Sequence, residues 1–299
     1  MRRWQKINRL SLGPLAGLAF LGCLAIALAL WLRSPGLDVR DGRDDRGKNG
    51  IVLGSGWIVG DAGKPTVAVG DLARSIREHH ITEIYLQVPP PNGDGALPGL
   101  DAARTEALLY ECYDARGWAQ ISGASFPLDD VRWRRFFILD LRRLLDRHPR
   151  LRGVQFDLTA VADGNAALLT LLDEIRAVLA PDTRPLSIVA ANWSEPYFRE
   201  VARRADQLVI PLEVSASVFS RFSTARNLER IGNALVWCEG RPVLVRIPAD
   251  KRLRRGLATI HLGLSRQSLP EQYQGIVLDT ADGPSAAGWL DFRARFVKP

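Results

Sequence analysis

Residues 152–159 alternate between apolar and polar side chains and read Arg152-Gly153-Val154-Gln155-Phe156-Asp157-Leu158-Thr159. Successive side chains of a β-strand point to opposite faces, so Gln155, Asp157 and Thr159 share one face and the apolar residues between them share the other. This pattern predicts a strand whose polar side chains point into a barrel. Asp157 then either holds a ligand or only bonds to neighbouring strands.

The rest of the chain, from about residue 50, alternates short apolar runs with longer helical patterns. Most of the short runs are rich in Val, Ile and Leu, as strands covered on both faces are. The predicted strands span residues 51–58, 81–88, 119–123, 153–159, 186–193, 207–214, 243–248 and 275–280. Apolar residues spaced three and four apart predict helices over 67–80, 104–116, 130–147, 166–179, 195–204, 225–238, 252–263 and 285–296.

Eight strands that alternate with helices over about 250 residues have the size and order of a (β/α)8 TIM-type barrel. The alternative is a doubly wound open sheet, which usually carries a glycine-rich phosphate loop after its first strand. Gly54-Ser55-Gly56 is followed by Trp57-Ile58-Val59, which is no helix start. The sequence therefore favours the α/β barrel over residues 50–299.

A long apolar segment precedes this domain. Residues 12–32 carry no charge, and about 20 apolar residues suffice to span a bilayer. Arg2, Arg3, Lys6 and Arg9 precede the segment and predict a cytoplasmic N-terminus. We expect residues 1–33 to form a single-pass anchor in the cytoplasmic (inner) membrane, 34–49 a polar linker, and 50–299 a periplasmic or extracellular domain. A cleaved signal peptide, or a lipoprotein modified at Cys23, are the alternatives.

The charge of the chain argues against nucleic acid as a partner. The formal net charge is +7, but residues 1–33 hold five of the 40 Lys and Arg and none of the 33 Asp and Glu. The remaining 35 basic and 33 acidic residues nearly balance. The four His residues are scattered, so the sequence predicts no metal site, and no motif implies a cofactor. Cys112 and Cys238 either pair or remain buried thiols.

Around residues 152–159 the chain resembles the family 18 glycoside hydrolases, whose fourth strand carries Asp-Gly-x-Asp-x-Asp-x-Glu. Gly153 and Asp157 match this motif, whereas Arg152, Gln155 and Thr159 depart from it. Residues 186–191, 206–213 and 243–248 resemble the fifth, sixth and seventh strands of that family. The resemblance implies that the motif Glu is the general acid of a substrate-assisted mechanism. Thr159 does not ionise in the working range, so the usual mechanism is absent.

The resemblance implies a glycan as ligand and directs attention to the ends of the strands. Asp157 is expected to hold a polar substrate group, Glu213 to act as a substitute acid, and Gln155, Arg246 and Asp279 to bind the substrate. Sugar rings stack on aromatic faces, for which the candidates are Trp57, Tyr85 and Trp193. Glu213 and Arg246 fall on adjacent strands and are predicted to form an ion pair.

Three functions follow from this arrangement. The first is a membrane-anchored glycoside hydrolase-like barrel that acts on cell-envelope or extracellular glycans. The second is a non-catalytic glycan-binding module, and the third is an envelope protein that uses the barrel as a scaffold. The absence of the acid at Thr159 leaves enzymatic activity open.

Overall fold

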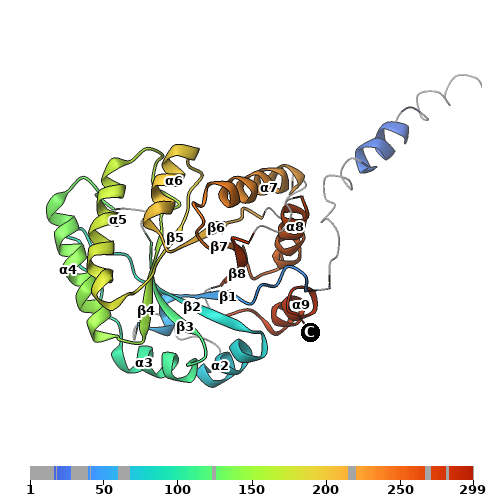
Figure 1. The fold of residues 1–299 in the computed structure, drawn as a ribbon. Coiled ribbons are helices and arrows are strands. Elements are labelled where there is room, and N and C mark those ends of the chain that lie inside the picture. The colour runs from blue at the N-terminus through green and yellow to red at the C-terminus, as the bar shows by residue number, and fades with distance from the viewer. Residues whose placement is uncertain are drawn as a thin grey trace, which may run out of the picture.

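The computed structural model describes residues 17, 19–27, 40, 42–59, 68–122, 126–214, 220–266, 271–280 and 283–298. Within these ranges eight strands pair in parallel and close into one barrel in chain order (Figure 1). The strands are β1 (Asn49–Leu53), β2 (Ile81–Val88), β3 (Arg116–Ser122), β4 (Leu151–Asp157), β5 (Leu186–Val189), β6 (Gln207–Pro211), β7 (Val243–Pro248) and β8 (Tyr273–Asp279). The predicted (β/α)8 barrel is confirmed, and the open sheet is wrong.

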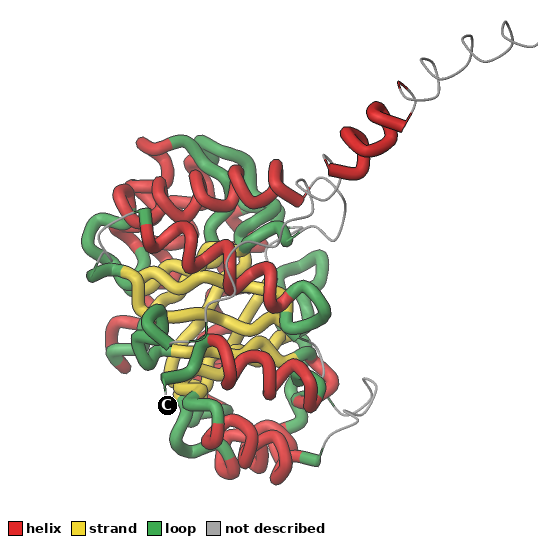
Figure 2. Tube along the Cα trace, turned by 90° about the vertical axis from the view of Figure 1, so that its right-hand side faces the viewer, coloured by secondary structure: helices red, strands yellow, loops and turns green. Residues whose placement is uncertain are grey.

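Helices surround the strands, as the side view also shows (Figure 2). They are α2 (Val69–Glu78), α3 (Ala102–Glu111), α4 (Val131–Arg147), α5 (Ala166–Leu179), α6 (Glu195–Arg204), α7 (Ser220–Trp237), α8 (Leu253–Ser265) and α9 (Ala286–Arg295). Two short 3-10 helices, η1 (Ser55–Trp57) and η2 (Ala180–Asp182), lie in connections. Asp101, Asp130 and Asn165 accept backbone hydrogen bonds at the starts of α3, α4 and α5 and so fix where these helices begin.

The apolar core has two parts, one inside the barrel and one between barrel and helices. Seven side chains fill the interior: Val52, Tyr85, Trp118, Val189, Val209, Leu244 and Val277. The alternate side chains of the same strands pack against the helices. Gly153 leaves room for the Trp118 ring, which occupies the space where a Cβ would stand.

Residues 42–48 lie against the N-terminal end of the barrel, although the sequence places them in the linker. Asp45 accepts hydrogen bonds from the Asn49 side chain (2.9 Å) and from the backbone N–H of Lys298 (3.2 Å). The Asp44 carboxylate contacts His261 Nδ1 on α8 at 3.0 Å. The chain is therefore fixed to the barrel from Gly42 onward, seven residues before β1 begins.

Much of the predicted membrane segment, residues 12–32, lies outside the described residues. Residues 17 and 19–27 are helical, and Phe20, Leu21, Leu24 and Ile26 are each more than half exposed. None of the helices within the described ranges is both long enough and apolar enough to cross a bilayer.

The two cysteines of the barrel are free thiols. Cys112 and Cys238 are both buried and neither forms a disulfide. Burial raises the pKa of the Cys112 thiol to about 12, and burial also raises the pKa of Cys238. Of the two alternatives from the sequence, buried thiols are confirmed.

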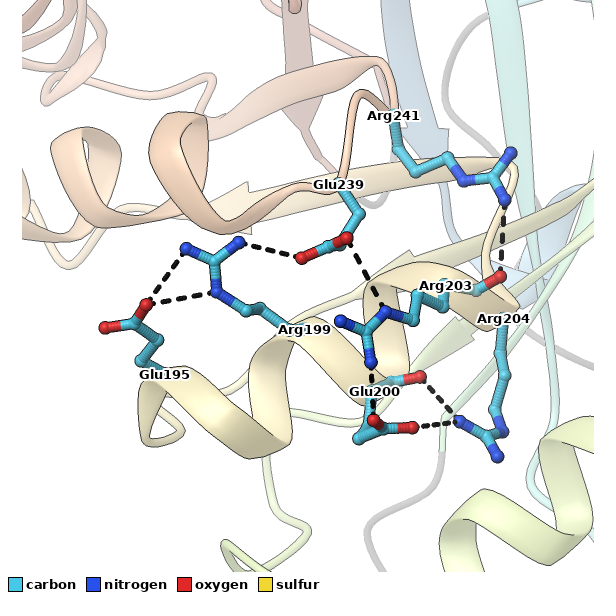
Figure 3. A network of polar contacts seen from close by, with 7 residues as sticks. All are labelled: Glu195, Arg199, Glu200, Arg203, Arg204, Glu239 and Arg241. Atoms are coloured by element: carbon cyan, nitrogen blue, oxygen red, sulfur yellow. Dashed lines mark hydrogen bonds and ion pairs between the residues drawn. The ribbon is translucent and has the colours of Figure 1, made fainter.

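An ion-pair network on the outside of the barrel joins α6 to the turn after α7 (Figure 3). Glu239 in that turn contacts Arg199 at 2.7 Å and Arg203 at 3.5 Å, both on α6. The hydrogen bond from Arg199 is the main cause that lowers the pKa of Glu239. Exposed pairs of this kind contribute little free energy each, so the network orients α6 more than it stabilises the fold.

Candidate functional site

Three charged side chains meet at the C-terminal end of the barrel. Arg246 on β7 extends across the barrel mouth and donates from Nη1 to Asp157 Oδ2 on β4 at 2.8 Å. Its Nε lies 3.5 Å from Asp279 Oδ2 at the end of β8. The side chains of Arg246 and Asp157 are 13% and 16% exposed, whereas that of Asp279 is 41% exposed. One guanidinium therefore bridges a largely buried carboxylate and a carboxylate open to solvent.

Thr159 engages the other oxygen of Asp157. Its hydroxyl donates to Asp157 Oδ1 at 2.7 Å, and its backbone N–H donates to the same atom at 3.2 Å. Both oxygens of Asp157 are thus bonded within the protein. Thr159 therefore holds Asp157 in place.

The predicted ion pair between Glu213 and Arg246 is wrong, because Arg246 is bonded to Asp157 and Asp279. Glu213 follows the end of β6, is 66% exposed, and lies 3.7 Å from Arg226 and 3.6 Å from Arg230 on α7. The buried Asn227 accepts from the backbone N–H of Glu213 and donates to its carbonyl, both at 3.2 Å. This segment turns outward because β6 ends at Pro211, three residues earlier than predicted.

A hollow of about 440 Å³ opens beside Arg246 at the ends of β6, β7 and β8. Its volume lies within the range of about 300–1,000 Å³ that is usual for small-ligand sites. Charged groups of both signs face it together with apolar and prolyl side chains: Pro211, Leu212, Glu213, Val214, Ser223, Arg246, Ile247, Pro248, Arg252 and Asp279. This hollow brings together three of the predicted site residues, Glu213, Arg246 and Asp279.

Gln155 points into the barrel as predicted but lies below the mouth and is fully buried. It donates to Ser187 Oγ at 3.0 Å, and its Oε1 has no hydrogen-bond partner among the described residues. Gln207 donates to the hydroxyl of Tyr85 at 2.6 Å, and burial raises the pKa of Tyr85 well above its usual value. Gln155 therefore belongs to a polar layer inside the barrel and offers no exposed atom to a ligand.

The three aromatic side chains predicted to stack on sugars are buried. Trp57 packs between strands and helices, and Tyr85 fills the barrel interior. Trp193 donates to the Val161 carbonyl at 2.9 Å and meets Tyr197 edge to face. Each has less than a tenth of its surface exposed. A sugar ring therefore has no free aromatic face to stack on at these positions. The apolar pattern in the sequence does not distinguish an aromatic side chain of the core from one that lines a binding site.

Arg252 also lines the hollow. It was not predicted as a site residue, because it begins the predicted helix 252–263. Arg252 contacts Asp250 at 2.7 Å, and that side-chain hydrogen bond is the main cause that raises its pKa. The charge of Asp279 also raises the pKa of Arg252. Its position in the connection after β7 could have indicated a place at the barrel mouth, because the connections that follow the strands form that end of the barrel.

No family model matches the chain, and no curated protein matches its sequence. Solved structures do match its fold. The spore cortex-lytic enzyme of Bacillus cereus gives a TM-score of 0.61 at 12% identity and covers 84% of this chain and 75% of that one. A family 18 chitinase from the chitin utilization locus of Flavobacterium johnsoniae gives a TM-score of 0.56 at 13% identity, and the match covers 84% of this chain and 94% of the chitinase.

The chain has the barrel fold of a family 18 chitinase. A cellulose synthase subunit of Clostridioides difficile has the same type of fold, with a TM-score of 0.54 at 10% identity and coverage of 82% and 99%. Identities this low establish the fold alone, since one barrel supports many activities.

Proposed function

We propose that this protein is a membrane-anchored barrel that binds a glycan of the cell envelope at its mouth without cleaving it. The observation that carries the proposal is the bridge from Arg246 to Asp157 and Asp279 beside an open hollow. Arginine and carboxylate groups at such an edge form hydrogen bonds with sugar hydroxyls. The likeness to an enzyme that lyses spore cortex and to chitinases supports a glycan as the ligand.

Hydrolysis by the family 18 mechanism does not fit these residues. The hydroxyl of Thr159 is too weak an acid to protonate a leaving group, and both oxygens of Asp157 are already hydrogen-bonded. Loss of a positioned general acid usually costs about 10² to 10⁴ in rate. A second candidate is a hydrolase that uses Asp279 as its acid. Its support is the half-exposed carboxylate of Asp279, which shares Arg246 with Asp157 and so lies within the about 10 Å span of paired glycosidase carboxylates.

The glycan proposal is tested by measuring binding and turnover on the same material. We expect the full chain to bind N-acetylglucosamine oligosaccharides or peptidoglycan sacculi and to release no reducing ends from them. Arg252→Gln removes a donor from the hollow and should weaken binding about tenfold, the loss typical of one charged hydrogen bond.

Arg254→Gln is the matched control, because Arg254 on α8 pairs with Asp291 on α9 at 2.9 Å, outside the hollow. Its glycan affinity should equal that of the wild type. Turnover that disappears in Asp279→Asn would establish the hydrolase instead. Failure of every such glycan to bind would end both proposals.

The anchor is the second part of the proposal, and its support lies in residues 12–32 and in the exposed apolar side chains of residues 19–27. We expect the protein to stay in the membrane pellet after washing with high salt and alkaline carbonate and to be released only by detergent. Replacing Leu21, Leu24 and Ile26 with lysine should move it out of the pellet, because each charge at mid-bilayer costs about 3 kcal/mol. Release of the wild-type protein by carbonate would refute the anchor.

A further inference from the structure

We propose that the N-terminal face of the barrel docks on anionic lipid headgroups of the same membrane. The contact surface is the basal patch, formed by Tyr110, Tyr113, Arg116, Arg150, Arg152 and Arg184. This inference rests on the proposed anchor but not on the glycan, and it goes beyond both by assigning a lipid surface to the face opposite the mouth.

Arginines surround a hollow at this face. Arg116 is the first residue of β3 and Arg152 the second of β4, and Arg184 lies two residues before β5 begins at Leu186. With Pro149, Pro185 and residues 182–183 they line a hollow of about 640 Å³. The strands are parallel, so all three arginines lie at the N-terminal end of the barrel, away from Asp157 and Arg246.

Two of these guanidinium groups retain free donors. Arg116 and Arg152 are exposed, and within the described ranges neither has a carboxylate at ion-pair distance. Arg184 is only 13% exposed and its Nη1 is buried, so it adds positive charge to the wall of the hollow more than an open donor. Asp182, which lines the same hollow, lies 3.2 Å from Arg142 and 3.6 Å from Arg184, so it offsets part of the charge of Arg184 but contacts neither Arg116 nor Arg152. Arginine presents a planar fork of donors that matches the oxygens of a phosphate group. The hollow is therefore suited to phosphodiester headgroups.

Two tyrosines extend the patch at the same end. Tyr110 lies in the last turn of α3 and Tyr113 two residues after its end, and they are 64% and 70% exposed. The guanidinium of Arg150, which pairs with Glu106 at 3.1 Å, lies 5.4 Å from the centre of the Tyr110 ring. Tyrosine is enriched where proteins meet the headgroup layer, because the ring is apolar and the hydroxyl stays wet. Exposed tyrosines beside arginines distinguish this face from an ordinary charged surface.

The attachment of the chain places the patch near the bilayer. Residues 42–48 are fixed at the N-terminal end by the contacts of Asp44 and Asp45 with His261, Asn49 and Lys298. Nine residues, 33–41, lie between Leu32 and Gly42, and the ten Cα–Cα steps from one to the other reach at most about 35 Å. The anchor thus enters at the face that bears the patch. Docking there would turn the hollow beside Arg246 away from the membrane and toward the envelope.

The test uses the full chain in lipid vesicles. A Cys23→Ser background carries a donor dye either at Asp114→Cys, beside the patch, or at Asp94→Cys, in the connection after β2 on the mouth side. Energy transfer to acceptor-labelled headgroups is compared in phosphatidylcholine vesicles with and without one-third phosphatidylglycerol. We expect strong transfer from position 114 only when anionic lipid is present, and weak transfer from position 94 in both.

Replacing Arg116, Arg152 and Arg184 with Gln should shift the docking equilibrium on the order of 100-fold, at about fivefold for each charge near an anionic surface. The matched control replaces the exposed Arg74, Arg132 and Arg254 with Gln and should leave transfer unchanged. Equal transfer from position 114 in both lipids, with the protein still in the vesicle fraction, would overturn the docking and leave the anchor standing. A protein absent from the vesicle fraction would overturn both.

Discussion

Alanine in place of Gly275 should prevent the barrel from closing. Gly275 has a φ of +153°, and a Cβ there would collide with the carbonyl oxygen of Lys48 and lie 2.7 Å from the carbonyl carbon. These are backbone atoms, so no side-chain rotation relieves the overlap. Lys48 also donates its N–H to the Gln274 carbonyl at 3.2 Å, which holds the two segments together. We expect a loss of more than about 4 kcal/mol, a large part of the 5–15 kcal/mol that stabilises a typical domain.

The measurement is the yield of soluble protein together with denaturant unfolding followed by tryptophan fluorescence. Gly70→Ala is the matched control, because Gly70 in α2 has no atom near the position of a Cβ. That change should stabilise the protein by up to about 1 kcal/mol through helix propensity. A Gly275→Ala protein that unfolds within about 1 kcal/mol of wild type would show that the seam between β8 and β1 can shift.

The sequence predicts the order of elements well because the apolar periods differ between strand and helix. β2 and β7 begin and end where predicted, and so do α5 and α6. The errors lie where apolar residues continue past a strand into a buried connection. Residues 51–58 were expected to be one strand, but β1 stops at Leu53 and η1 carries the buried Trp57.

The site was harder to predict, since it depends on contacts across the barrel. Asp157 and its inward direction follow from the alternation in β4, but its partner is 89 residues away on β7. Strand adjacency favoured Glu213 for Arg246, whereas the long side chain of Arg246 reaches across the barrel mouth to Asp157 on β4. Asp279 was predicted only at the end of the eighth strand, and its contact with Arg246 was not foreseen.

Replacing Arg246 with methionine should destabilise the barrel by about 2 kcal/mol and abolish glycan binding. Methionine keeps the long apolar stem but leaves Asp157, which is 16% exposed, with only Thr159 as a partner. Removing one member of a fully buried pair costs about 3–5 kcal/mol, and the partial access of water to this pair reduces that cost. Arg246→Lys should retain part of the stability, because its single ammonium group cannot bridge Asp157 and Asp279 in the same way.

A double-mutant cycle with Asp157→Asn separates the pair from its surroundings. If the two side chains act together, the coupling free energy should lie between about 0.5 and 3 kcal/mol, and the double variant should be less damaged than the sum of the single ones. The glycan affinities of the same four proteins decide the role of the bridge. Wild-type affinity in Arg246→Met would mean that the bridge only closes the barrel mouth and that the ligand, if any, binds elsewhere. Affinity lost in Arg246→Met but kept in Asp157→Asn would mean that Asp157 positions the guanidinium and Arg246 itself contacts the sugar.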